Sequence, residues 1–249
     1  MTQHSLQGRS EDEVLWFRRR GFMAAATAWT ALGGFAAAQA QQRSNIVELS
    51  GDALINGQRL DPQQTVQTGD SLDTGPGSHL IFVIGNASFL VRQNSRLTVQ
   101  RGNTLNVVSV LRLITGAVAS VWGRGTSRQI VTPALTAGIR GTGVYAEVFP
   151  QQGDRSYFCN CYGTVDVAAA LGVDRILSQS VYHQSFWGEV EPRNGHFLTP
   201  ALAINHTDEE MENLAGLIGQ RTAWQIAGRK GDHNGSGYLE PNQIHPLMR

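Results

Sequence analysis

Short runs of apolar residues, separated by turn-forming residues, fill the chain from about residue 45 to about residue 150. Some runs are continuous, such as 79–84, whereas others alternate apolar with polar residues, such as 96–100. Alternation is typical of a strand with one buried face, and Asn56-Gly57 is a dipeptide preferred in two-residue hairpin turns. The runs recur about every eight to twelve residues without a helical pattern between them, which is typical of all-β folds. We therefore expect a mainly β fold: an antiparallel β-sandwich, a roll or a short β-solenoid.

The second half of the chain is less regular. Residues 156–167 form a pattern typical of one more strand or strand pair. The segment that begins at Thr207 has the signals of a helix start, because Thr207 and Glu210 are spaced as a capping box and acidic residues favour the first turn. Four apolar residues then fall on one face before Gly219, a typical helix end: Met211, Leu214, Leu217 and Ile218. We expect a smaller, partly helical C-terminal region.

The first forty residues have the organisation of an export signal. Arg19 and Arg20 precede a mildly apolar stretch of about 15 residues, and Ala38-Gln39-Ala40 follows as a small-x-small cleavage site. The arginine pair resembles a bacterial twin-arginine signal, which predicts cleavage after Ala40 and a periplasmic or otherwise exported protein. The alternative, an uncleaved membrane anchor, needs about 20 strongly apolar residues. No later stretch is apolar enough for a transmembrane helix, so none is expected in the mature chain.

Composition and charge narrow the class of protein. The 249 residues are 41% hydrophobic, and 20 Lys plus Arg balance 20 Asp plus Glu. This composition is typical of a folded globular protein. Formal neutrality argues against nucleic acid as a partner, because phosphate affinity depends on clustered positive charge. Two cysteines are too few for a disulfide framework.

Part of the chain resembles a known family. The segments 68–75, 129–133 and 137–145 resemble motifs of the FecR domain family, named for the periplasmic part of a ferric-citrate signalling regulator. The resemblance covers about residues 45–150 and is most specific in a terminal strand pair, whose motif residues are Thr132, Pro133, Ile139, Arg140, Gly141 and Thr142. It implies an exported all-β module used for binding, interaction or signalling, with no catalytic residues to transfer.

Cys159 and Cys161 are the strongest candidates for chemistry. Residues two apart on a strand point to the same face, so the thiols should lie side by side. Their Cα atoms would be roughly 6.5 to 7 Å apart, which makes a relaxed disulfide between them awkward. Paired thiolates suit a soft transition metal such as zinc or iron, and His183, His196 and His206 are available to complete a four-coordinate site.

Two other interpretations of the cysteines stay open. One is a redox-active or oxidised pair, and the other is a pair of small buried hydrophobic residues without chemistry. The motif Cys-x-Cys is less specific than paired Cys-x-x-Cys knuckles.

The C-terminal tail resembles a degenerate calcium loop of the EF-hand type. The candidate ligands are Asp232, Asn234, Ser236, the Tyr238 carbonyl, Glu240 and Gln243. Gln243 replaces the bidentate glutamate of that loop, so any calcium affinity should be weak. The alternative is a polar terminal turn.

These features give four segments: a signal peptide over 1–40, the FecR-like β domain over 45–150, a Cys/His-containing strand and helix region over 151–228, and a polar tail over 229–249. The favoured function is a non-enzymatic binding or sensing module of the cell envelope. Its partner, an envelope protein or a small ligand, is not identified by the sequence. The alternative is a metal-dependent or redox protein that uses Cys159 and Cys161. Motifs of hydrolases, zinc proteases and nucleotide-binding loops are absent from the sequence.

Overall fold

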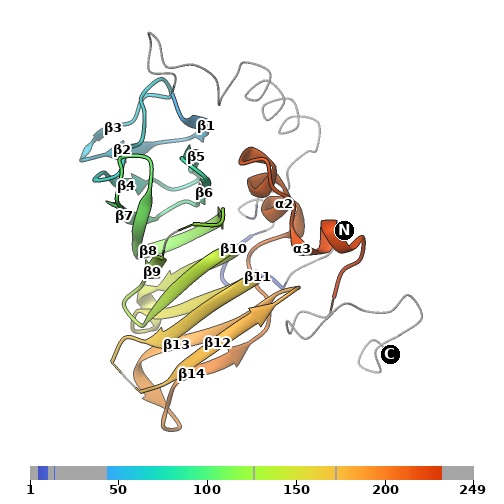
Figure 1. The fold of residues 1–249 in the computed structure, drawn as a ribbon. Coiled ribbons are helices and arrows are strands. Elements are labelled where there is room, and N and C mark those ends of the chain that lie inside the picture. The colour runs from blue at the N-terminus through green and yellow to red at the C-terminus, as the bar shows by residue number, and fades with distance from the viewer. Residues whose placement is uncertain (1–4, 11–13, 15–43, 126, 172, 232–249) are drawn as a thin grey trace.

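The computed structural model describes residues 5–10, 14, 44–125, 127–171 and 173–231. Strands dominate them, and two short helices follow near the C-terminal end (Figure 1). The expectation of a mainly β fold followed by a smaller helical part is confirmed. The predicted signal peptide, with Arg19, Arg20, Ala38 and Ala40, lies outside the described residues apart from the stretch 5–10 and Val14. The candidate calcium loop from Asp232 to Gln243 also lies outside them.

The described residues form fourteen strands, which follow one another along the chain: β1 (Ile46–Ser50), β2 (Ala53–Ile55), β3 (Gln58–Arg59), β4 (Ser71–Thr74), β5 (His79–Ile84), β6 (Ala87–Val91), β7 (Arg96–Arg101), β8 (Val108–Trp122), β9 (Arg128–Val131), β10 (Leu135–Phe149), β11 (Arg155–Ala169), β12 (Arg175–Ser180), β13 (Gln184–Arg193) and β14 (His196–Ala201). A single turn of 3₁₀ helix, Pro150–Gln152, joins β10 to β11.

The strands form one continuous sheet. Its main path runs β14-β13-β11-β10-β9-β8-β7-β4-β2-β3. β1, β5, β6 and β12 branch from this path. Neighbouring strands are antiparallel except for β8 and β9. Three 15-residue strands, β8, β10 and β11, allow the branching, because β10 pairs with β9 over its first half and with β8 over its second.

The two faces of the sheet bury different clusters. One cluster reaches from Ile46 to Leu198 and contains most of the aliphatic residues. The other lies on the opposite face beneath the helices and contains Tyr145, Tyr157 and both cysteines. The aliphatic cluster crosses residue 150, so the β structure and its core continue into the second half of the chain.

A bulge in β10 and β11 changes which residues face each cluster. Before it, odd-numbered Ala137 and Ile139 of β10 belong to the aliphatic cluster; after it, even-numbered Val144 and Ala146 do. The pairing shifts on both sides of Gly143. An extra residue in one strand reverses the alternation beyond it. The bulge therefore turns Cys159 and Cys161 toward the helices rather than into the aliphatic cluster.

The motif residues of the FecR resemblance build the hairpin and this bulge. The Thr132 hydroxyl closes the turn after β9, because it accepts a hydrogen bond from the Leu135 amide at 3.1 Å. Gly141 has a φ of +66°, which favours glycine. The buried Thr142 hydroxyl lies against the Tyr162 carbonyl of β11. Pro133 lies in the turn, Ile139 is buried and Arg140 is exposed.

The helices cover the face that bears the cysteines. α2 (Asp208–Leu217) begins with the predicted capping box: the Thr207 hydroxyl accepts from the Glu210 amide, and the Glu210 carboxylate accepts from the Thr207 amide. α3 (Ala223–Ala227) has a second capping box, made by Thr222 and Gln225. α2 packs on β6 and β8, where the Ser88 hydroxyl donates to the Leu214 carbonyl at 2.7 Å. Among the described residues, no helix is long and apolar enough to cross a bilayer.

Candidate metal centre

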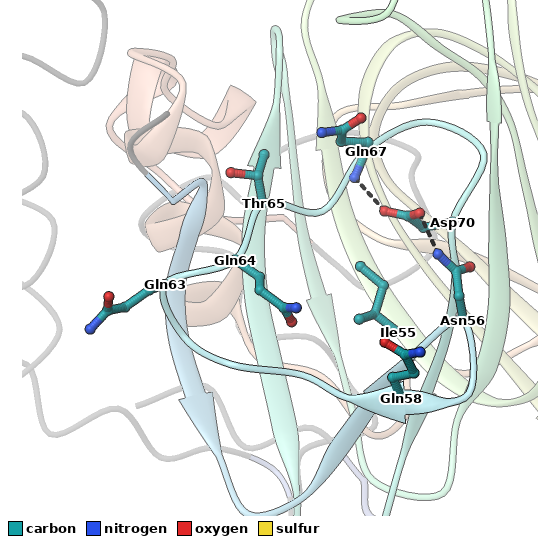
Figure 2. Close-up of a pocket in the computed structure, with 8 residues that line it drawn as sticks. All are labelled: Ile55, Asn56, Gln58, Gln63, Gln64, Thr65, Gln67 and Asp70. Carbon is teal, nitrogen blue, oxygen red and sulfur yellow. Dashed lines mark hydrogen bonds between the residues drawn. The ribbon is translucent and has the colours of Figure 1, made fainter. Parts of the chain in front are cut away.

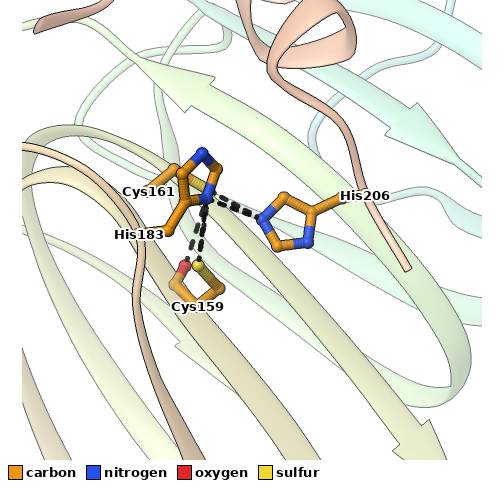
Figure 3. Close-up of side chains that lie close together, drawn as sticks. All are labelled: Cys159, Cys161, His183 and His206. Atoms are coloured by element: carbon orange, nitrogen blue, oxygen red, sulfur yellow. Dashed lines mark hydrogen bonds between the residues drawn. The ribbon is translucent and has the colours of Figure 1, made fainter. Parts of the chain in front are cut away.

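Four of the five candidate ligands meet beneath the helices. Cys159 and Cys161 extend from the middle of β11, His183 lies in the turn between β12 and β13, and His206 precedes α2 (Figure 3). One donor atom from each lies within 4.8 Å of the donor atoms of the others. The sulfurs are 3.7 Å apart and both cysteines are free, as the same-face argument predicts.

Backbone geometry places each histidine. His183 has a φ of +40°, uncommon for a residue other than glycine, and its amide donates to the Cys161 carbonyl at 2.9 Å. The turn after β12 is thereby held against β11. His206 follows Asn205, whose φ is +60°. The turn at Asn205 aims the His206 ring back toward β11.

Four of the six distances between the donor atoms match those of a tetrahedral site. Zinc–sulfur bonds of about 2.3 Å and zinc–nitrogen bonds of about 2.0 Å give tetrahedral edges of about 3.8 Å between sulfurs, 3.5 Å between sulfur and nitrogen, and 3.3 Å between nitrogens. Here the sulfurs are 3.7 Å apart and the two nitrogens 3.1 Å apart. The sulfur–nitrogen edges are 3.6 Å for Cys159 with His183 and 3.4 Å for Cys161 with His206.

The outer nitrogen of each imidazole is already committed to an acceptor. His183 Nε2 lies 2.8 Å from a carboxylate oxygen of Asp208, and His206 Nδ1 lies 2.6 Å from the Ile204 carbonyl oxygen. These partners accept hydrogen bonds, so the proton of a neutral ring belongs on the outer nitrogen. The inner nitrogens then carry lone pairs and face each other at 3.1 Å. Either a proton shared between the two nitrogens or a metal cation bound by both removes this repulsion.

The close contacts among these side chains shift their pKa values in opposite directions. Burial alone would raise the pKa of Cys159, but the hydrogen bond from Cys161, the electrostatic effect of His206 and hydrogen bonds from both imidazoles hold that pKa well below its ordinary value. Burial and the neighbouring Cys159 raise the pKa of Cys161. Burial would lower the pKa of His183, yet Asp208 and Cys159 raise it to about 9. A divalent cation that binds here would displace the protons still held by the thiols and the imidazoles, so metal binding would release protons.

Aromatic residues and one carboxylate enclose the donors. All four donor residues are fully buried. The His206 ring stacks on Tyr145 at 4.7 Å, and the His183 ring stacks on Trp224 of α3 at 5.2 Å. Asp208 also accepts from the Tyr182 hydroxyl at 2.9 Å and pairs with Lys230. Carboxylates behind metal-bound imidazoles fix ring orientation in this way.

His196, the fifth candidate, is not part of the cluster. It begins β14 at the exposed end of the β13–β14 hairpin, opposite Arg193. The sequence order gave no means to choose among the three histidines. In the sequence Asp208 has only the signals of a helix-start residue, although its position two residues after His206 indicates that it lies near the site.

A polar hollow lies far from these residues. It is lined by Ile55, Asn56, Gln58, Gln63, Gln64, Thr65, Gln67 and Asp70 (Figure 2). Several of the polar groups there are bonded to one another: Asp70 accepts from the Asn56 amide group and from the Gln67 backbone amide. The hollow is open and lacks aromatic or basic residues, so its lining does not specify a ligand class.

Comparisons with known proteins add little. No protein-family model and no curated protein sequence matches the chain. Two crystal structures of a proposed anti-sigma factor from Parabacteroides distasonis ATCC 8503 align with part of it, at 11% and 13% identity and TM-scores of 0.41 and 0.42. The alignments cover 53% and 55% of this chain and 58% and 60% of the other. Similarity this low carries no argument about function.

Proposed function

We propose that this protein is an exported, non-enzymatic binding and sensing module of the cell envelope, and that its fold holds one transition-metal ion. Cys159, Cys161, His183 and His206 are the ligands. The observation that carries the metal proposal is the pair of inner imidazole nitrogens, which face each other at 3.1 Å beside two thiols while their outer nitrogens are occupied. The resemblance of residues 45–150 to FecR domains supports the envelope role.

Zinc is the metal that the donors fit best. Two thiolates and two imidazoles in a tetrahedron form a common structural zinc site, and iron is the second choice for the same donors. Four protein donors leave no open coordination position, which is the pattern of structural rather than catalytic zinc. The ion would join β11, the β12–β13 turn and the start of α2.

Burial argues against the enzymatic alternative. Cys159, His183 and Asp208 are aligned like a nucleophile, a base and an orienting carboxylate, with His183 3.6 Å from the sulfur and 2.8 Å from the carboxylate. All three are fully buried, so a substrate has no access to the sulfur. The same alignment serves a metal ligand and its supporting carboxylate.

Metal analysis of the purified full chain tests the proposal. We expect one zinc or iron ion per chain, lost in the Cys159→Ser, Cys161→Ser double variant and kept in His196→Ala. Cobalt substitution should give the visible absorption of a tetrahedral site with thiolate ligands. A metal-free wild-type protein with two free thiols, or a double variant that keeps its metal, would contradict the proposal.

Amino-terminal sequencing of the exported form tests the envelope role. Cleavage after Ala40 predicts a mature chain that begins at Gln41. A chain found only in the cytoplasm with its first residues intact would refute this part of the proposal and leave the metal site unaffected.

A further inference from the structure

A segment from the start of the chain lies beside the proposed metal centre. Ser5 forms a bridge with Ile204, and its carbonyl accepts from the Asn205 amide at 3.1 Å. Arg9 pairs with Glu147 of β10 at 2.6 Å and is itself mostly buried. Val14 is also buried. The contacts of Ser5 join positions nearly 200 residues apart, next to the proposed ligand His206.

Asn205 is the centre of these contacts. Its side-chain oxygen accepts from the Gln7 amide at 2.8 Å, and its side-chain nitrogen donates to the Gln7 carbonyl at 2.9 Å. These two hydrogen bonds, one donated and one accepted, have the same pattern as a hydrogen-bonded residue pair of two strands. The same nitrogen donates to Glu147 at 2.8 Å, and the Asn205 carbonyl accepts from Arg92 at 2.8 Å. Residues 5–7 thus fix the residue that precedes His206.

Glu147 connects the segment to the site by a second route. One of its oxygens accepts a hydrogen bond from Arg9. The other accepts from the Tyr145 hydroxyl at 2.7 Å and from the Asn205 side chain. Tyr145 in turn stacks on the His206 ring, with an angle of 12° between the rings. Glu147 is only 3% exposed, so loss of Arg9 leaves one partner fewer for a buried carboxylate.

We infer that residues Ser5–Ser10 form a strap that docks on the surface made by Glu147, Ile204 and Asn205, and that strap docking and metal binding stabilise each other. The inference rests on the proposed metal site. Metal binding fixes His206 and hence the 204–206 loop, which the strap requires. By linkage, strap docking raises the metal affinity by the same factor by which metal binding raises the equilibrium constant for strap docking. Removal of the predicted signal peptide would therefore loosen the metal centre.

Hydrogen exchange on the full chain tests the docking. The Gln7 amide, which donates to Asn205, and the Asn205 amide, which donates to the Ser5 carbonyl, should exchange slowly in the wild-type protein. Gln7→Pro removes the first donor, and Arg9→Ala removes the ion pair; each should speed exchange of the Asn205 amide by about ten-fold. Arg59→Ala, which removes an exposed arginine paired with Asp52, is the control and should change nothing there.

Zinc affinity tests the coupling. Measured by competition with a coloured chelator, the zinc affinity of the full chain should be about five-fold lower in Arg9→Ala and Gln7→Pro than in wild type or Arg59→Ala. Fast exchange of residues 5–10 in a zinc-loaded wild-type protein would overturn the strap and spare the metal site. A protected segment in a protein that binds no zinc would refute the metal site instead. Fast exchange of the Asn205 amide in both variants with unchanged zinc affinity would overturn the coupling.

Discussion

Asp208 belongs to two structures at once. As the first residue of α2 it lies where a negative charge favours the helix, and its carboxylate orients His183 from behind. The buried carboxylate also receives Tyr182 and Lys230. One side chain therefore couples the start of the helix to the position of a proposed metal ligand.

Asp208→Asn should weaken metal binding without removing a ligand. The amide keeps the size of the carboxylate but loses its charge, so the hydrogen bond to His183 weakens and the metal affinity should fall about 10- to 100-fold. Competition with a chelator of known affinity measures the change. The neighbouring, half-buried Glu209→Gln is the matched control, and an equal loss there would show a general charge effect.

Asn205→Ala should destabilise the fold by about 3 kcal/mol, because several buried groups lose a partner and the left-handed backbone is unfavourable for alanine. Asn205→Gly keeps the backbone freedom and loses the side-chain bonds alone. Urea unfolding of both variants separates the two costs. A stability within error of the wild-type value in both would show that Asn205 does not organise the loop.

At the scale of elements, the bulge in β10 and β11 decides where the chemistry lies. It brings β10 close to α2: a side chain at Gly143 would place its first carbon 2.4 Å from the Tyr162 ring and 2.8 Å from Met211. Because the alternation of faces reverses at the bulge, β10 and β11 contribute side chains to both buried clusters.

Gly143→Ala should therefore cost about 1 to 3 kcal/mol of stability, because the added methyl overpacks the contact with Tyr162 and Met211. Gly138→Ala in the same strand is the control, since its methyl would lie 3.7 Å from Asp166, an ordinary contact. Urea unfolding compares the two. Equal effects would mean that the close approach at Gly143 is unimportant.

Asp174 links the loop after β11 to β14, and it should respond to pH. The amides of Leu198 and Phe197 donate to its carboxylate and lower its pKa. Because the folded pKa lies below the unfolded value of about 3.9, the stabilisation is present above that value and is lost as pH falls through the folded pKa. NMR titration of Asp174 checks the direction; Asp174→Asn should remove this part of the pH dependence.

For the whole molecule, the proposed metal ion joins three separate parts of the chain. β11, the β12–β13 turn and the start of α2 each contribute ligands, and Trp224 of α3 packs on His183. The helices also bury Met211, Leu214, Leu217 and Trp224 against this face. Metal binding should therefore add to apolar packing in holding them on the sheet.

Chelation should lower the melting temperature of the full chain. A metal present at about 1,000 times its dissociation constant contributes about 4 kcal/mol, which corresponds to about 10 °C for a chain of this size. Scanning calorimetry with and without a strong chelator measures the shift. The double cysteine variant should melt at the same temperature in both conditions; a chelator effect of equal size there would contradict the assignment.

The sequence by itself determined the elements whose signals are local. Alternation predicted the strands, Thr207 and Glu210 predicted the start of α2, and the two-residue spacing of Cys159 and Cys161 predicted adjacent thiols, because each depends on neighbours along the chain.

Only the tertiary structure decided which histidines join the thiols and which face of β11 they occupy. His183 and His196 are equally plausible in sequence, but a turn at φ +40° brings His183 to Cys161, while His196 starts an exposed hairpin strand. The contacts of Asp208, Asn205 and residues 5–10 depend likewise on long-range packing around the bulge. Such contacts have no periodicity along the chain, because their partners are set by the folding of the sheet.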